Sequence, residues 1–141
     1  AGACRCTDMT ADEIRSHFPA WMPPFCYDVS YARPTSDWLL NKFYPWWRAE
    51  RWGADLATWS RKNDCDNFAR AFAVYCQDAH ALTPQGDEGL AVGEFCYQAA
   101  AGPHAIVCAF TDEGRIFVEP QTGKRIELTP QEILTCFRAS F

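Results

Sequence analysis

The second half of the chain contains two apolar segments joined by a tight turn, and this pattern constrains the fold most strongly. Residues 104–110 are almost continuously apolar, Thr111 to Gly114 has the composition of a turn, and residues 115–119 can form the return strand. If the turn is a two-residue one, Thr111 faces Gly114 and the pairing register of the whole hairpin follows. The sequence therefore predicts an antiparallel hairpin with a defined register.

Helical spacing of apolar residues marks the first half of the chain. The longest candidate helix runs from Cys65 to about Gln77, with Asp64 as its N-terminal cap. Shorter helices are expected near residues 10–18, 35–43 and 45–52. Thr10 and Thr129 each precede a glutamate by three residues, which is typical of the capping box that opens a helix.

Helices that come first and an antiparallel sheet that follows are typical of an α+β fold. We expect a single domain over residues 1–141, with a helical half at about 1–80 and a sheet half at about 88–141. In this arrangement the central helix packs on a small antiparallel sheet.

Composition excludes several classes of protein. Apolar residues make up 48% of the chain and charged residues 22%, so the chain can form a core and disorder is not expected. The net charge is −5 without a basic run, which argues against a nucleic-acid partner. No apolar stretch is long enough to cross a bilayer, so we expect a soluble protein without a membrane partner. No targeting segment is visible, although a start at Ala1 leaves open a removed signal peptide, so the compartment stays open.

Eight cysteines are many for a chain of 141 residues. An all-paired framework would use every one of them, whereas a free Cys65 would leave an odd number, so the redox compartment stays open. The spacing of Cys4 and Cys6 is too tight for a usual zinc site. Three of the cysteines lie within apolar segments and are expected to be buried: Cys76, Cys96 and Cys108.

Cys65 is the strongest candidate for a nucleophile. A thiol attacks as its thiolate, and Cys65 lies in the first turn of the predicted helix, where unpaired N–H groups and the helix dipole favour an anion. The backbone N–H of Cys65 could also stabilise an oxyanion, with Asn63 as a site-supporting residue.

His104 is the best placed of the three histidines to act as the base. It follows a Gly-Pro break and begins an apolar strand, whereas His17 and His80 lie where we expect solvated surface. In the predicted register Glu119 faces Ile106, so His104 and Glu119 are diagonal neighbours on one face of the hairpin. A carboxylate there would orient the imidazole, and Gln121 would face His104 directly.

Three sequence blocks also suggest a family. Asp-Cys-Asp-Asn-Phe-Ala at 64–69, Gly-Pro-His-Ala at 102–105 and Glu-Pro-Gln at 119–121 together resemble the papain-like cysteine peptidase domain attached to certain fungal galactose-binding agglutinins. They also resemble a group of small phage and bacterial proteins. The resemblance covers roughly Asp64 to Thr122 and implies a papain-like fold with a Cys-His-Glu triad at Cys65, His104 and Glu119.

The function expected from this reading is a cysteine-dependent hydrolase, a peptidase or amidase that acts on a peptide or protein through a thioester. The alternatives are a transglutaminase-like acyl transferase or cell-wall amidase, and a non-catalytic phage or bacterial interaction protein that keeps the fold. The fungal domain is calcium-dependent, so calcium is a candidate cofactor with Asp66 and Asn67 as ligands. Asn67 stands where a second acid is expected, which weakens such a site. No organic cofactor is expected.

The six tryptophans all precede Cys65 and have two interpretations. Trp38, Trp46 and Trp47 can form part of the core that covers the sheet and the central helix. Alternatively, one or two of them line a groove for a ligand.

Overall fold

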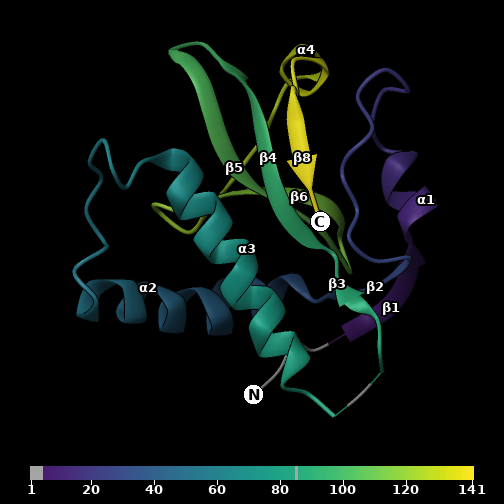
Figure 1. The fold of residues 1–141 in the computed structure, drawn as a ribbon, viewed down its shortest axis with the longest axis horizontal. Coiled ribbons are helices and arrows are strands. Elements are labelled where there is room, and N and C mark those ends of the chain that lie inside the picture. The colour runs from purple at the N-terminus through teal and green to yellow at the C-terminus, as the bar shows by residue number, and fades with distance from the viewer. Residues whose placement is uncertain (1–4, 85) are drawn as a thin grey trace.

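The computed structural model describes residues 5–84 and 86–141 (Figure 1). The spacing of Cys4 and Cys6 therefore lies outside the described side chains. In the described residues, eight strands form two sheets, and one long helix crosses the larger sheet.

The larger sheet has five strands in the order β7-β6-β5-β4-β8. Its strands are β4 (Val92–Ala99), β5 (Gly102–Thr111), β6 (Gly114–Glu119), β7 (Lys124–Ile126) and β8 (Arg138–Ser140). All neighbouring strands are antiparallel. Thr111 pairs with Gly114 and Val107 pairs with Val118, which confirms the predicted hairpin register.

The first two strands of the smaller sheet come from segments that were not expected to form strands. Its order is β1-β2-β3, where β1 is Arg5–Thr10, β2 is Ser30–Pro34 and β3 is Gly89–Leu90. β1 and β2 are antiparallel, and β2 and β3 are parallel. The Ala91 N–H donates to the Ala32 carbonyl, and the Phe110 N–H donates to the Ala91 carbonyl, so Ala91 links the two sheets.

The helices begin close to where the sequence predicts them. They are α1 (Ala11–Arg15), a π-helical turn η1 (Trp38–Phe43), α2 (Tyr44–Gly53), α3 (Cys65–Ala81) and α4 (Pro130–Leu134). The capping boxes predicted at Thr10 and Thr129 are both present. α4 is short, and the chain that follows it joins the sheet as β8.

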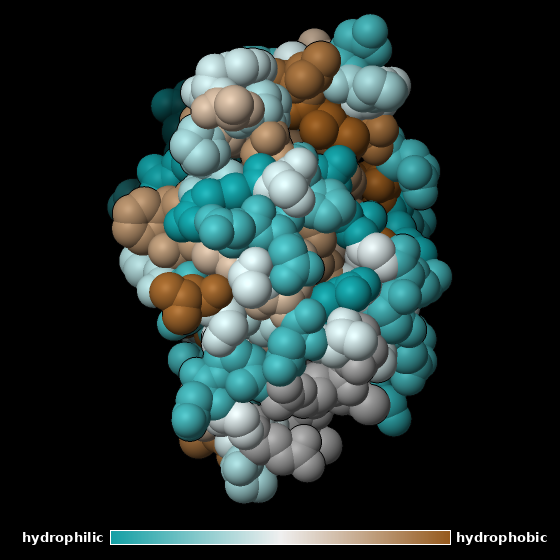
Figure 2. All heavy atoms as spheres, turned by 90° about the vertical axis from the view of Figure 1, so that its right-hand side faces the viewer, coloured by the Kyte–Doolittle hydropathy of each residue, from teal (hydrophilic) through white to brown (hydrophobic). Residues whose placement is uncertain are grey.

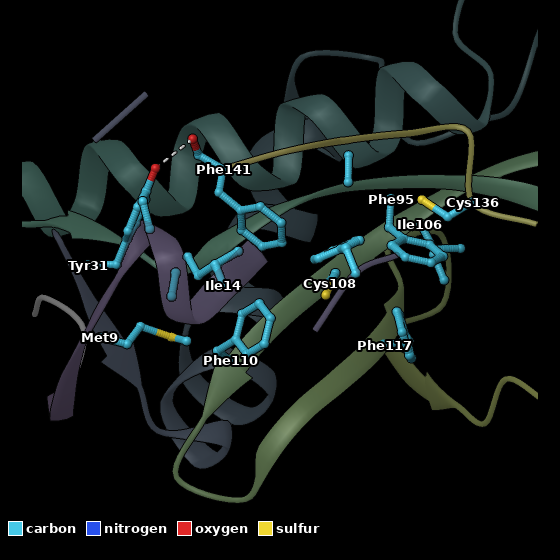
Figure 3. Close-up of a cluster of buried hydrophobic side chains, with 14 of the residues drawn as sticks. Met9, Ile14, Tyr31, Phe95, Ile106, Cys108, Phe110, Phe117, Cys136 and Phe141 are labelled. Carbon is cyan, nitrogen blue, oxygen red and sulfur yellow. Dashed lines mark hydrogen bonds between the residues drawn. The ribbon is translucent and has the colours of Figure 1, made fainter. Parts of the chain in front are cut away.

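Apolar side chains cover both faces of the five-stranded sheet. Alternate β5 residues divide between two clusters: Ile106, Cys108 and Phe110 pack on one side, and Val107 and Ala109 on the other. The first cluster includes residues from α1 and the C-terminal segment, and Figure 3 shows these side chains gathered there. The second cluster includes side chains of η1, α2 and α3. The sheet is thus the middle layer of the molecule.

The expected fold class is corrected by this architecture. The prediction was an α+β, papain-like domain with a helical half packed on a small antiparallel sheet. Instead, the half that was expected to be helical contributes the strands β1 and β2. The main sheet has five strands, and the helices α1 and α4 span only five residues each. The physical reason is that β1, β2 and β8 are short segments that are strands only because a distant partner pairs with them.

Membrane-spanning helices are not found in residues 5–84 and 86–141: none is both long and apolar enough. Figure 2 shows the side of the molecule that carries α1 and the smaller sheet. This face is mostly hydrophilic, with apolar side chains gathered near its upper edge.

Candidate functional site

Cys65 is the first residue of α3, as the sequence predicts. Its side chain is partly exposed and packs against a small buried cluster of Ala69, Cys96 and Ala105. Ala69 belongs to the next turn of α3, whereas Cys96 and Ala105 face each other on β4 and β5. The first turn of α3 therefore lies directly on these two strands, with the thiol at its edge.

His104 and Glu119 are hydrogen-bonded, which confirms the geometry predicted from the hairpin register. His104 Nε2 lies 2.7 Å from Glu119 Oε1, and the two side chains are 26% and 18% exposed. The Tyr97 ring packs edge-on against the imidazole, with centroids 6.0 Å apart. An ionised carboxylate can only accept, so Nε2 carries the hydrogen and Nδ1 keeps its lone pair. The hydrogen bond therefore orients the imidazole with Nε2 toward Glu119.

Chain order places the backbone of His104 close to the strand position on which Cys65 packs, although side chains 104 and 105 leave opposite faces of β5. His104 directly precedes Ala105 on β5, and Ala105 is one of the residues against which Cys65 packs. In Figure 1 the first turn of α3, the start of β5 and the loop after β6 lie on the same side of the molecule. Within residues 5–84 and 86–141 no hydrogen bond joins Cys65 to His104.

Gln121 supports Glu119 through its backbone. Its N–H donates to Glu119 Oε2 over 3.2 Å, so both carboxylate oxygens are bonded. Its carbonyl accepts from Arg48 Nη1 over 2.5 Å, which ties this turn to α2. β6 ends at Glu119, so Gln121 belongs to a turn and does not pair across the hairpin with His104.

Asn63 is buried, and its side chain holds the loop that precedes Cys65. Oδ1 accepts from Arg51 Nη2 over 2.6 Å, while Nδ2 donates to the carbonyls of Leu56 and Thr58. These bonds occupy the amide, so the Asn63 side chain holds the backbone of this loop.

Two aspartates flank the thiol. Asp64 is the N-cap of α3, and its N–H donates to Asn67 Oδ1 over 3.2 Å in a capping box. Asp66 pairs with Arg70 over 3.0 Å. A hydrogen bond between the two carboxyl groups raises the pKa of Asp64 and lowers that of Asp66. The start of α3 therefore carries two neighbouring carboxyl groups whose pKa values shift in opposite directions.

A calcium site at Asp66 and Asn67 remains a prediction. Within the described part of the chain, no group of three or more histidine, cysteine, aspartate or glutamate side chains is arranged to hold a metal. Both proposed ligands already have protein partners, since Arg70 pairs with Asp66 and Asn67 bonds the Asp64 backbone. A cation would have to compete with these bonds.

The other described cysteines are much less suited to act as nucleophiles. Burial raises the pKa of Cys96 and Cys108 to about 12 and that of Cys136 to about 11. It also raises the pKa of Cys26, and that of Cys76 well above its ordinary value. The predicted burial of Cys76, Cys96 and Cys108 is confirmed. A thiolate at any of these positions is disfavoured near neutral pH.

A second concave site lies at the other end of α3. The pocket has a volume of about 720 Å³ and lies between η1, the start of α2 and the last turns of α3. Trp46 and Tyr75 are 50% and 45% exposed there, and their ring centroids are 6.3 Å apart. Lys42 and Asp78 supply opposite charges to its lining. Trp38 and Trp47 are core residues, which fits the interpretation of the tryptophans as part of the core. Trp46 lines the pocket, which fits their interpretation as the lining of a groove.

Arg51 and His80 are buried, although no sequence pattern indicated a role for Arg51 and His80 was predicted at the surface. Arg51 is buried in α2, where an arginine normally marks an exposed face. His80 was expected at the surface, but it is 7% exposed, and its Nε2 lies 2.9 Å from the Glu88 carbonyl. No local sequence pattern predicts the burial of Arg51 or His80, because both side chains are covered by loops that fold back over the helices.

No protein-family model and no curated protein sequence matches the chain. Two solved structures match in fold. One is described as "PSL1a-E64 complex", with a TM-score of 0.72, 18% identity, and coverage of 95% of this chain and 50% of that one. The other is a Polyporus squamosus lectin "bound to human-type influenza-binding epitope Neu5Aca2-6Galb1-4GlcNAc", with a TM-score of 0.71, 17% identity, and coverage of 95% and 49%.

The chain therefore spans about half the length of these structures and shares their fold over that half. One of these structures is a lectin, and this finding contradicts the family expected from sequence, the papain-like cysteine peptidase domain and its phage and bacterial relatives. The predicted hydrolase, both alternatives to it, and the predicted peptide or protein substrate are corrected on the same finding. The three blocks are short motifs, and short motifs alone do not establish an activity.

Proposed function

We propose that Cys65, His104 and Glu119 form a nucleophilic-thiol site that binds an electrophilic ligand covalently. The observation that carries the proposal is the 2.7 Å bond between His104 Nε2 and Glu119 Oε1, one residue along β5 from the strand position on which Cys65 packs. A held imidazole beside a thiol at a helix N-terminus is the arrangement that activates a cysteine. The proposal concerns formation of the adduct and does not include turnover.

The chemistry follows from the two histidine nitrogens. Because Glu119 accepts from Nε2, Nδ1 is the nitrogen that would take the proton of the Cys65 thiol once the two side chains meet. With an epoxide as ligand, the sulfur forms a bond to one ring carbon while the bond from that carbon to oxygen breaks. The proton on Nδ1 then passes to the new alkoxide. The net result is addition of the thiol across the epoxide.

One matching structure supports the choice of an epoxide as probe, because it is described as a complex with E64, and E64 is an epoxide. The test is to incubate the chain with E64 at neutral pH, measure the intact mass and map the modified peptide. We expect a single adduct on Cys65. Cys65→Ala should give none, and His104→Ala should slow the reaction strongly.

Cys136→Ala is the matched control, because burial raises the pKa of this thiol to about 11. Its removal should leave the adduct unchanged. An adduct on another cysteine, or no adduct on the folded chain, would show that the proposed site is not a reactive thiol.

A second candidate function is saccharide binding in the aromatic pocket at the far end of α3. Two half-exposed aromatic rings can pack on the apolar face of a sugar, while a lysine and a carboxylate can bond its hydroxyl groups. The pocket volume of about 720 Å³ suits a short oligosaccharide. The matching lectin is described with a bound sialylated trisaccharide, which supports the choice of ligand class.

Titration with Galβ1-4GlcNAc and its α2-6-sialylated form, followed by NMR shifts of the tryptophan indoles, tests this candidate. Trp46→Ala should abolish the shifts. Trp52→Ala removes a tryptophan that is 73% exposed and does not line the pocket, so it should bind like the unmodified chain. Equal binding by both variants, or none by the unmodified chain, would exclude this pocket as a saccharide site.

A further inference from the structure

We propose that Arg51 is a positioning residue for Cys65, which holds the loop before the thiol and the first turn of α3 in one arrangement. This inference rests on the proposed thiol site. Arg51 lies in α2 and is 7% exposed, so the structure encloses a cation that water would otherwise solvate. Burial of this charge is costly unless hydrogen bonds and aromatic contacts compensate it. The partners of the guanidinium therefore indicate the role of Arg51.

The guanidinium of Arg51 lies between aromatic rings. Its central carbon is 4.6 Å from the centroid of Phe68 and 5.3 Å from that of Trp47. Phe68 is three residues after Cys65, on the first turn of the same helix. The planar cation therefore packs on the turn that carries the thiol.

The edge of the guanidinium holds the preceding loop. Nη2 donates to Asn63 Oδ1 over 2.6 Å, and Nε donates to the Leu56 carbonyl over 3.2 Å. Asn63 in turn holds other parts of the loop. Its Nδ2 donates to the carbonyls of Leu56 and Thr58, and its backbone N–H and carbonyl form two hydrogen bonds with the backbone of Ser60. The loop is thus cross-linked two residues before Cys65.

Arg51 therefore contacts the chain on both sides of the thiol. One contact is to Asn63 before Cys65 and the other is to Phe68 after it. The bonds from Arg51 to this loop go to neutral oxygens, and its central carbon lies over two aromatic rings, so a guanidinium fits where an ammonium group would lose most of the contacts. A misplacement of a nucleophile by about 1 Å can reduce a rate by roughly a hundredfold, so small losses of order here should be measurable.

The test compares the alkylation rate of Cys65 by iodoacetamide at one pH with the thermal midpoint of unfolding. Arg51→Met should lower the rate roughly tenfold at a temperature well below its midpoint, and amide exchange at Ser60 and Asn63 should accelerate. Arg51→Lys should recover only part of the rate. A merely structural role would lower the midpoint and leave the rate of the folded protein unchanged, which would overturn the inference.

Arg61→Met is the matched control, because it removes an exposed arginine from the same loop. It should change neither rate nor exchange. If Arg51→Met does not fold, Asn63→Ala removes the same hydrogen bond from the other partner and should produce the same loss of rate. Iodoacetamide alkylates any accessible thiolate, so the comparison stands even if E64 leaves no adduct. The absence of that adduct would overturn the thiol-site proposal separately.

Discussion

At the scale of single residues, the distinction between the two nitrogens of His104 decides what the candidate site can do. Glu119 holds Nε2, and the Gln121 N–H holds the second oxygen of Glu119. A carboxylate fixed at both oxygens orients the imidazole and selects the tautomer whose Nδ1 is basic. The site therefore depends on Glu119 both for the orientation of the His104 ring and for the negative charge beside it.

Replacing Glu119 with glutamine tests this dependence. The amide keeps the size of the side chain but can also donate to Nε2, which favours the opposite tautomer and leaves an imidazolium without its counter-charge. We expect the reaction of Cys65 with E64 to slow by roughly a hundredfold, while the thermal midpoint changes little. Kinetics by intact mass provide the measurement, with the exposed Glu127→Gln as control. An unchanged rate would mean that Glu119 does not orient the base.

Calcium provides a second prediction at this scale. The neighbouring Asp66 carboxyl raises the pKa of Asp64, so a cation bound beside the pair would oppose this shift by favouring both ionised carboxylates. If Asp66 and Asn67 bind calcium, addition of millimolar calcium after dialysis against a chelator should raise the thermal midpoint. Asp66→Asn should abolish the increase. A midpoint that does not respond would indicate that these residues only cap α3.

At the scale of elements, the pairing of β8 with β4 closes one edge of the main sheet. Glu94 of β4 is buried, and its Oε1 accepts from Arg138 Nε over 3.1 Å and from the Ser140 hydroxyl over 3.2 Å. The neighbouring Gly93 lies where a Cβ atom would be 1.9 Å from the Ser140 carbonyl oxygen. The close approach of these two strands therefore requires glycine at this position.

Gly93→Ala should weaken this edge. The new methyl group would displace the Ser140 backbone, and we expect a loss of about 1–3 kcal/mol in the free energy of unfolding. Gly53→Ala is the control, because a Cβ there meets nothing within 4 Å. It should be neutral or slightly stabilising. Urea unfolding followed by circular dichroism measures both, and equal stability of the two variants would contradict the packing argument.

At the scale of the whole molecule, the buried thiols link stability to pH. Burial raises the pKa of Cys96 and Cys108 from 9.0 to about 12 and that of Cys136 to about 11. In the unfolded chain these thiols ionise near their ordinary pKa, whereas in the folded protein they stay protonated. The unfolded state therefore binds fewer protons between these values. The stabilisation is fully present below pH 9 and is lost as the pH rises toward 12.

We expect the free energy of unfolding to fall above pH 9 by about 1.4 kcal/mol per pH unit for each such thiol. Urea titrations at pH 7.5, 9 and 10 measure the slope. Cys108→Ala should start from a lower stability, because it leaves a cavity, but it should show a shallower slope. Cys65→Ala removes a partly exposed thiol and should keep the slope. A flat profile from pH 9 to pH 10 would contradict the assignment of these thiols as buried and free.

Local sequence was sufficient for features that depend on neighbours along the chain. The capping boxes at Thr10 and Thr129, the start of α3 at Cys65 and the register of the β5–β6 hairpin were all predicted correctly. Each rests on a contact between residues a few positions apart or on a turn of fixed length. The hydrogen bond between His104 and Glu119 followed from the register.

Tertiary structure alone decided the features that depend on distant partners. β1, β2 and β8 lack a strand pattern of their own and exist because remote backbone groups pair with them. The burial of Arg51, Asn63 and His80 likewise requires loops that fold back over helices, which no periodicity records. Short-range preferences are weak compared with the burial and pairing that the whole fold supplies. The sequence by itself therefore determined where the helix and hairpin of the candidate site begin, and the packing of α3 on β4 and β5 decided that they meet.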